Sequence, residues 1–334
     1  YAKVSTRGKL LFLNQNMWRL SVIDKQTQSQ KFAIYGLQKV IEEFLRTMQG
    51  SAREFLTQKE FGKATLILPP LPEQKKIASI LTSVDEVIES TQKQIDKLQD
   101  LKKATMNRLL TKGIGHTKFK DSDMGRIPKS WEVRAISAAS SLITKGATPT
   151  TSGHAYIENG INFYRSVNAS EDGQLKNIKV KHISLKANKS LRRSVLRLDD
   201  VVISIVGAKT GKTFFCITKE SELPGNINQN VALIRPTERL LNSRFLSYTF
   251  VAPYFQKQVD RELTTQAQPC LSLKQVGEFC IKIPTYDEQI KIVEKLDSLS
   301  QTLSKKRSKS ISLGKLKKSL MQDLLTGKVR VQVN

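Results

Sequence analysis

The residues of this sequence best suited to chemistry are basic side chains without acidic neighbours. Residues 179–193 carry six lysines and arginines and no acid. Such a run suits a surface that follows the phosphates of a nucleic acid. The alternative is a solvated polar face with no ligand. The sequence favours the phosphate-binding interpretation, with Lys181 and Lys186 as contacts.

Amides, hydroxyls and arginines with base-reading chemistry occur in segments expected to be loops. Arginine commonly pairs with guanine, and asparagine or glutamine with adenine, through two hydrogen bonds. Asn228 and Gln229 fit this chemistry, although just before a strand they could equally bond the local backbone. The other expected contacts are in a polar loop, after a strand near residue 164, and in a second polar loop: Lys145, Thr148, Arg165, Ser166, Asn168 and Gln268.

The stretch at residues 207–213 resembles a phosphate loop but has the wrong spacing. Three residues separate Gly207 from the Gly211-Lys212 pair, where a Walker A loop has four, and a strand pattern follows in place of a helix. We expect either a basic turn whose Lys209, Thr210 and Lys212 donate to DNA phosphates, or a plain hairpin turn.

Residues for catalysis are not grouped in the sequence. His116, His154 and His182 are scattered and have no acidic partner at metal-site spacing, so we expect no metal and no catalytic residue. An Asn/Asp-Pro-Pro-aromatic motif and a glycine-rich cofactor turn are both missing, which argues against methyl transfer by this chain alone. The three cysteines suit buried, reduced thiols better than disulfides.

Composition places the chain among folded, basic proteins. Its 334 residues allow two domains, and its formal net charge of +25 favours a polyanion, with nucleic acid first, as its partner. No apolar run is long enough for a membrane span or a signal peptide, so we expect a cytoplasmic protein without a membrane partner.

An internal repeat organises the chain. The Pro69-x-x-Pro-Glu-Gln-x-x-Ile segment recurs as Pro284-x-x-Asp-Glu-Gln-x-x-Ile at an offset of 215 residues, and Leu-Leu-Thr at 109–111 recurs at 324–326 in the same register. Asn14-Gln15-Asn16 answers residues 228–230 at an offset of 214. A period this long indicates a duplicated module rather than a solenoid. The counterpart of residues 125–211 would precede Tyr1, so we expect the first copy to lack its front.

Each module ends in a long segment with heptad spacing. Residues 73–112 contain no Gly or Pro and fit one helix, and residues 288–326 repeat the pattern with a weaker middle and a glycine at 314. Both helices need a partner for their apolar face, and we expect them to pair with each other. We expect an antiparallel pair because a folded domain connects the two helices. The expected contact positions are Ile77, Leu81, Val84, Ile88, Ile95, Leu98, Leu296, Leu299, Leu303 and Leu313.

Between these helices, β-rich runs alternate with turn signals. Strands are expected at residues 162–164, 180–185, 201–206, 213–217 and 231–234. One helix, capped by Asn242 or Ser243, should follow and present Phe245 through Phe255 on its apolar face. The first module shows the same order, with a strand near 17–22 and a helix at about 32–48.

Several of these segments resemble the specificity subunits of Type I restriction-modification systems. The Pro-Pro-Leu-Pro-Glu-Gln stretch from Pro69 is similar to the entry into that family's inter-domain helix, and Leu-Leu-Thr-Lys-Gly at 109–113 to its exit. Gly125-x-Ile-Pro-x-x-Trp131-Glu is similar to the start of its target recognition domains. Ser300, in place of the carboxylate found at Asp85, departs from this pattern and puts the packing of the second helix end in question.

The resemblance implies α/β or α+β target recognition domains joined by long antiparallel coiled-coil helices. The expected division is part of a first recognition domain at 1–71, a helix at 72–115, a second recognition domain at 116–286, and a helix with the tail at 287–334. Each recognition domain would read half of a bipartite double-stranded DNA target. Two methyltransferase subunits, which would hold S-adenosylmethionine, and restriction subunits would supply the chemistry. The alternative function is a basic coiled-coil adaptor for acidic proteins.

Overall fold

The computed structural model describes residues 20–47, 58–263 and 269–333. Contacts divide the chain into two compact units, Tyr1–Leu98 with Thr302–Asn334 and Gln99–Gln301. Within the described residues, no helix is long and apolar enough to cross a membrane. The boundaries of the recognition domains expected from the sequence stay predictions.

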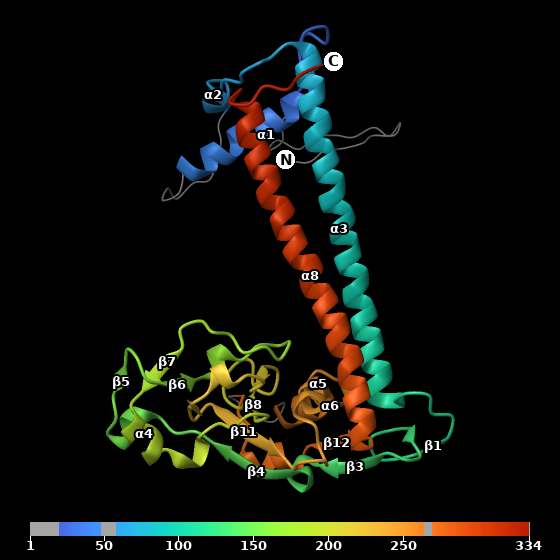
Figure 1. The fold of residues 1–334 in the computed structure, drawn as a ribbon, viewed down its shortest axis with the longest axis vertical. Coiled ribbons are helices and arrows are strands. Elements are labelled where there is room, and N and C mark those ends of the chain that lie inside the picture. The colour runs from blue at the N-terminus through green and yellow to red at the C-terminus, as the bar shows by residue number, and fades with distance from the viewer. Residues whose placement is uncertain (1–19, 48–57, 264–268, 334) are drawn as a thin grey trace. The chain divides into compact units, whose positions relative to one another are not determined.

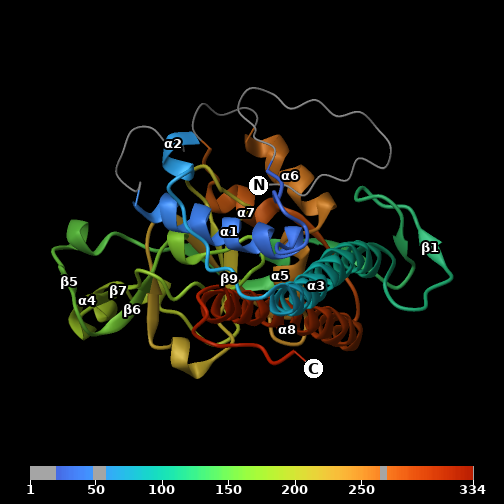
Figure 2. The same cartoon turned by 90° about the horizontal axis from the view of Figure 1, so that it is seen from above.

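Two long helices, α3 (Leu71–Lys112) and α8 (Tyr286–Leu325), run antiparallel, as the fold class predicts (Figures 1 and 2). In the first unit, Leu81 near the start of α3 packs in one cluster with Leu324 at the end of α8. In the second unit, Leu109 at the end of α3 packs with Ile292 at the start of α8. Helix α8 is unbroken at Gly314, since the neighbouring residues are good helix formers.

The heptad seam accounts for the buried face of both helices. Ile77, Leu81 and Leu296 are buried completely or nearly so, and every expected seam position is buried or half-buried. Full burial of one such aliphatic side chain contributes roughly 1.5–3 kcal/mol. Polar contacts flank the seam, where Lys306 bonds Gln94 and Lys317 pairs with Asp85.

The second unit holds the sheets. One has the strand order β10-β6-β7-β5, in which only the β10–β6 pair is parallel, and another is antiparallel with the order β4-β11-β8-β9. Two-stranded pairs join β12 to β3 and β1 to β2. The strands expected between the two long helices are all found. The strands are β1 (Phe119–Lys120), β2 (Ile127–Pro128), β3 (Glu132–Ala135), β4 (Ser140–Lys145), β5 (Tyr156–Ile157), β6 (Ile161–Tyr164), β7 (Lys181–Ile183), β8 (Val201–Ser204), β9 (Phe214–Cys216), β10 (Gly225–Ile227), β11 (Val231–Pro236) and β12 (Cys280–Ile283).

Helices on these sheets bury a large apolar core. Asn242 caps α5 (Ser243–Phe250) by accepting a hydrogen bond from the Phe245 N–H. The prediction of a single helix here was wrong. Helix α5 ends at Phe250, and α6 (Pro253–Leu263) begins at Pro253, because proline lacks the N–H needed to continue a helix. The remaining helices of this unit are α4 (Leu185–Ser190) and α7 (Leu273–Glu278), with short 3₁₀ turns η1 (Ile136–Ala139), η2 (Pro149–Ser152), η3 (Ser166–Asn168), η4 (Arg192–Ser194) and η5 (Glu220–Glu222).

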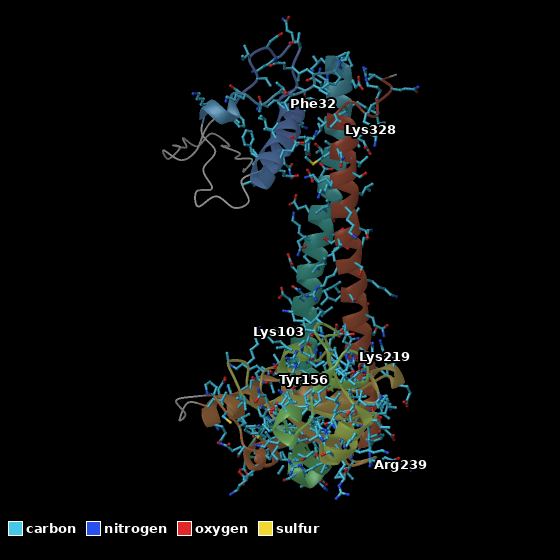
Figure 3. All side chains as sticks on the ribbon, turned by 90° about the vertical axis from the view of Figure 1, so that its left-hand side faces the viewer. Phe32, Lys103, Tyr156, Lys219, Arg239 and Lys328 are labelled. Atoms are coloured by element: carbon cyan, nitrogen blue, oxygen red, sulfur yellow. The ribbon has the colours of Figure 1, made fainter. Side chains whose placement is uncertain are left out.

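The first unit contains α1 (Gln30–Thr47), as expected, and a short α2 (Gln58–Phe61). Phe32 of α1 is buried beside the long helices (Figure 3). The strand expected near residues 17–22 is not formed over Leu20–Val22, and its earlier part lies outside the described residues. Asn14, Gln15 and Asn16 also lie outside them.

The recurring Glu-Gln pair lies at the start of each long helix, where its side chains make similar hydrogen bonds in both modules. Gln289 is fully buried, and its Nε2 donates to the carbonyls of Leu240 (2.9 Å) and Pro284 (3.1 Å). Its Oε1 accepts from the backbone N–H of Asn242 at 2.8 Å, which ties the cap of α5 to α8. The same three bonds recur around Gln74, with the partners Thr27, Pro69 and Ser29.

The glutamate of the pair binds the chain that leaves the opposite helix. Glu288 accepts from the Ile114 N–H (2.9 Å) and the Trp131 Nε1 (3.0 Å) and contacts His116 Nε2 at 2.8 Å. Gly113 precedes this segment at φ +64°, and a Cβ there would lie 2.4 Å from Glu288. In the first unit, Glu73 binds the tail in the same way, through Arg330 and Val331.

A tyrosine on each docked helix bonds a carboxylate and a hydroxyl of the long helix. Tyr35 Oη donates to Asp85 at 2.8 Å and lies 3.2 Å from the Thr82 hydroxyl. In the second module, Tyr248 Oη donates to Asp297 and lies 3.4 Å from the Ser300 hydroxyl. The carboxylate and the hydroxyl have therefore exchanged places. The departure noted at Ser300 leaves the packing intact, because Asp297 supplies the carboxylate one turn earlier.

Candidate nucleic-acid interface

The parallel pair β6 and β10 brings two predicted segments to one sheet edge. Tyr164 faces Ile227 in the register, and the Asn228 N–H donates to the Tyr164 carbonyl at 3.1 Å. Because parallel strands point the same way, the residues that follow them emerge side by side. Arg165 and Asn228 are those residues.

The loop after β4 joins this edge. Gly146 lies so close to β10 that a Cβ would come within 1.8 Å of the Ile227 carbonyl, so only glycine fits. Thr148 Oγ1 donates to Gln229 Oε1 at 2.5 Å, and Lys145 at the end of β4 is exposed. We refer to the segments 145–148, 165–166 and 228–229 as the convergent edge.

Asn168 shapes the convergent edge from inside the protein. It is fully buried, its Oδ1 accepts from the Arg165 N–H, and its Nδ2 donates to the carbonyls of Lys176 and Ile178. Ser166, in η3, is half-buried. Asn168 thus organises the loop, and we do not propose it as a DNA contact. Asn228 is also buried, and its Oδ1 accepts from the Asn230 N–H.

A buried polar network fixes the basic segment beside β10. Asn226 Nδ2 donates to Asn188 Oδ1 at 2.8 Å, and the Ser194 hydroxyl donates to Asn226 Oδ1 at 2.7 Å. Asn226 is fully buried. Sequence reasoning missed this network, although the Gly-Asn-Ile strand pattern with a central asparagine was its visible signal. It holds α4 and η4, whose exposed cations are Lys186, Lys189, Arg192 and Arg193.

Lys181 belongs to the same region. It faces Phe163 across β6 and β7, and its Nζ lies 5.8 Å from the centroid of the Tyr156 ring. Lys181 is exposed, so its charge is open to solvent. Together with the cations of α4 and η4, it adds positive charge beside the strands that carry the convergent edge.

The turn at residues 207–213 differs from the convergent edge in its charge pairing. It connects β8 to β9, and its exposed Lys209 and Lys212 form ion pairs with Glu171 (2.5 Å) and Asp260 (3.2 Å). The Thr210 hydroxyl is buried and donates to the Gly207 carbonyl at 2.6 Å, which closes the turn. We therefore do not propose Thr210 as a phosphate contact. Gln266 and Gln268 lie outside the described residues.

Features of other chemistries are limited in the described part of the chain. No group of three or more His, Cys, Asp and Glu residues there could hold a metal ion. The cysteines are free, but only Cys216 is buried, and Cys270 is exposed, contrary to expectation. Burial raises the pKa of the Cys216 thiol to about 12, so this thiol stays protonated at neutral pH.

Comparison with known families decides the assignment. Residues 1–100 and 128–313 match the family described as the Type I restriction modification DNA specificity domain. The chain belongs to this family. The two matched segments lie in the two modules of the repeat, and the resemblance inferred from the helix entries is confirmed.

Individual relatives agree with the family. The chain is 30% identical over 336 residues to the Type I restriction enzyme MjaVIII specificity subunit of Methanocaldococcus jannaschii, covering 97% of this chain and 76% of that one. It is 23% identical to the EcoBI specificity subunit of Escherichia coli, covering 86% of this chain but only 62% of that protein, so the chain spans less than two thirds of this relative.

Solved structures show the same fold. The HsdS subunit of Thermoanaerobacter tengcongensis aligns with a TM-score of 0.53 at 20% identity, covering 91% of this chain and 72% of that one. The S subunit of the Type I system of M. genitalium aligns with a TM-score of 0.57 at 15% identity, covering 91% and 74%.

Proposed function

We propose that this chain is the DNA sequence-specificity subunit of a Type I restriction-modification complex and has no catalytic activity of its own. The second recognition domain, at residues 116–286, reads one half of a bipartite target, and the domain to which residues 1–71 belong reads the other. The observation that carries the proposal is the convergent edge, where the segments that contain Lys145, Arg165 and Gln229 come together beside a basic segment in a member of this family.

The electrostatics support DNA as the ligand. The chain carries 55 basic and 30 acidic residues, and the cations of α4 and η4 are exposed without an ion pair in the described part of the chain. Neutralising phosphates with such cations releases counterions, which makes the affinity depend steeply on salt. Exposed lysines such as Lys186 supply sequence-independent affinity, and the convergent edge supplies sequence readout.

Partner subunits supply the chemistry in this proposal. The relatives are specificity subunits of restriction enzymes, and by analogy this chain recruits two methyltransferase subunits and, in the full complex, restriction subunits. S-adenosylmethionine binds to the methyltransferase subunits. The paired helices α3 and α8 act as a spacer that sets the gap between the two half-sites.

A binding experiment tests the proposal. The purified chain is titrated with a random-sequence duplex by fluorescence anisotropy between 50 and 200 mM salt. Six to ten phosphate contacts predict a loss of about 10³- to 10⁵-fold in affinity over this range. If the chain does not bind DNA at 50 mM salt but does bind acidic proteins, the result would instead support the adaptor function.

A second measurement tests the lack of catalysis. The chain is incubated with DNA and radiolabelled S-adenosylmethionine, with and without added methyltransferase subunits. Label should enter DNA only when those subunits are present. Incorporation by the chain alone contradicts the proposal.

A further inference from the structure

Arg165 differs from three ion-paired arginines of the second unit in what holds it. Arg134, Arg235 and Arg244 each form an ion pair with a carboxylate. Arg165 has no carboxylate partner in the described part of the chain, and its Nη2 donates to the Lys179 carbonyl at 2.9 Å. Its Nε is buried and has no hydrogen-bond partner among the described residues.

This arrangement costs stability and fixes the side chain. A buried donor left unpaired costs about 1–3 kcal/mol, and proteins rarely leave one without a compensating role. With Nε buried and one terminal nitrogen held by a carbonyl, the guanidinium keeps one orientation. A group already fixed in position loses little conformational entropy when it binds a ligand.

The neighbours of Arg165 favour a base over a phosphate as that ligand. It emerges beside Asn228 at the convergent edge, where Gln229 and Thr148 present an amide and a hydroxyl. Phosphate contacts can be made by exposed cations such as Arg192 on η4, because they need no fixed orientation toward a base edge. A planar guanidinium held in one orientation suits two-point recognition, and on DNA its matching partner is the O6 and N7 edge of guanine.

We propose that Arg165 is a specificity-determining residue that reads a guanine in the half-site bound by the second recognition domain. This inference rests on the proposed function, because it assumes that the convergent edge meets DNA. It adds one chemical identity, a guanine, to a target that the family assignment leaves open.

Selection from a random duplex library tests the proposal. DNA retained by the wild-type chain is sequenced and gives a motif, and the selection is repeated with Arg165→Ala and Arg165→Lys. Both variants should lose the preference for guanine at one position, by about 5- to 150-fold, and keep the rest of the motif. The lysine variant retains the charge, so its loss of preference separates bidentate reading from simple attraction.

Arg192→Ala is the matched control, since it removes an exposed cation from the same basic region. It should weaken binding to all sequences and lower the salt dependence by about one phosphate contact, without changing the motif. An unchanged motif in both Arg165 variants overturns the inference, as does a uniform loss with a lower salt dependence. A wild-type chain that selects no motif overturns the proposed function itself.

Discussion

At the scale of single residues, a glutamine and a glutamate attach each module to its long helix, and both modules use the same pair. Gln74 and Gln289 each close three hydrogen bonds, and Glu73 and Glu288 each bind the segment that leaves the opposite helix. Gln74, Gln289 and Glu73 are nearly or fully buried, where an unpaired polar atom is costly, and Glu288 is half-buried. The motif that marks the family is therefore structural in this chain.

Removing one amide should show this cost. Gln289→Ala leaves the Asn242 N–H and the carbonyls of Leu240 and Pro284 without their partner, so we expect the free energy of unfolding to fall by about 3 kcal/mol. Urea denaturation measures it. Gln301→Ala, exposed on the same helix, should change it by less than about 0.5 kcal/mol. Equal effects of the two substitutions would contradict the structural role.

The carboxylate of Glu73 should make stability depend on pH. The hydrogen bonds from Arg330, and then from the Val331 N–H, hold the pKa of this carboxyl below its ordinary value of 4.5. A group whose pKa is lowered by folding stabilises the protein above its unfolded pKa, and this contribution is lost as the pH falls through the folded pKa. The wild type should therefore exceed Glu73→Gln in stability at neutral pH, and the difference should shrink below pH 4.5.

Unfolding measured at a series of pH values checks this sign. Glu86→Gln is the control, since Glu86 is exposed on the same helix. A stability difference between the wild type and Glu73→Gln that grows as the pH falls would contradict the assignment.

At the scale of elements, the long helices tolerate exchange of side chains between neighbouring turns. Tyr35 meets a hydroxyl at 82 and a carboxylate at 85, whereas Tyr248 meets a carboxylate at 297 and a hydroxyl at 300. Residues three apart lie on one face of a helix, so either position can reach the tyrosine. The two modules share the contact to the tyrosine but not the residue at each position, and this contact holds α1 and α5 against the long helices.

A double-mutant cycle tests this exchange. Asp85→Ser removes the partner of Tyr35 and of Lys317 and should destabilise the chain by about 1.5–3 kcal/mol, the range for hydrogen bonds to charged groups. Adding Thr82→Asp recreates the arrangement of the second module and should restore part of the loss. Additive losses in the double variant would show that the two positions are not interchangeable.

Local patterns were sufficient to predict the two long helices but not the convergent edge. The heptads predict the buried seam because burial on one helix depends only on spacing along the chain. The proximity of the segments that contain Arg165 and Gln229 depends on parallel pairing of β6 and β10, which are far apart in sequence and carry no signal of register. The break before α6 was readable from Pro253, but the aromatic spacing across it favoured one helix.

At the scale of the whole molecule, the duplication of a basic module suits the proposed binding of two half-sites. Two modules that bind half-sites on one duplex need a fixed separation, because half-site spacing mirrors the spacing of the binding elements. We propose that the antiparallel helices supply it, since α3 packs against α8 within each unit and each helix is held at its start by the same residue types. The spacer proposal therefore predicts that helix length determines the gap in the target.

Lengthening both helices by one heptad tests the spacer. Seven residues that keep the seam pattern are inserted after Gln94 in α3 and after Lys306 in α8, positions that contact each other. Each helix gains about 10 Å at 1.5 Å per residue. Since base pairs are spaced by about 3.4 Å, the gap in the selected motif should widen by about three base pairs while both half-sites stay the same. Insertion into α3 alone shifts the seam against its partner and should weaken binding to either target. If the double insertion instead binds the original gap as well as the wild type does, the helices do not set the distance, and the separation of the half-sites must be determined within the recognition domains.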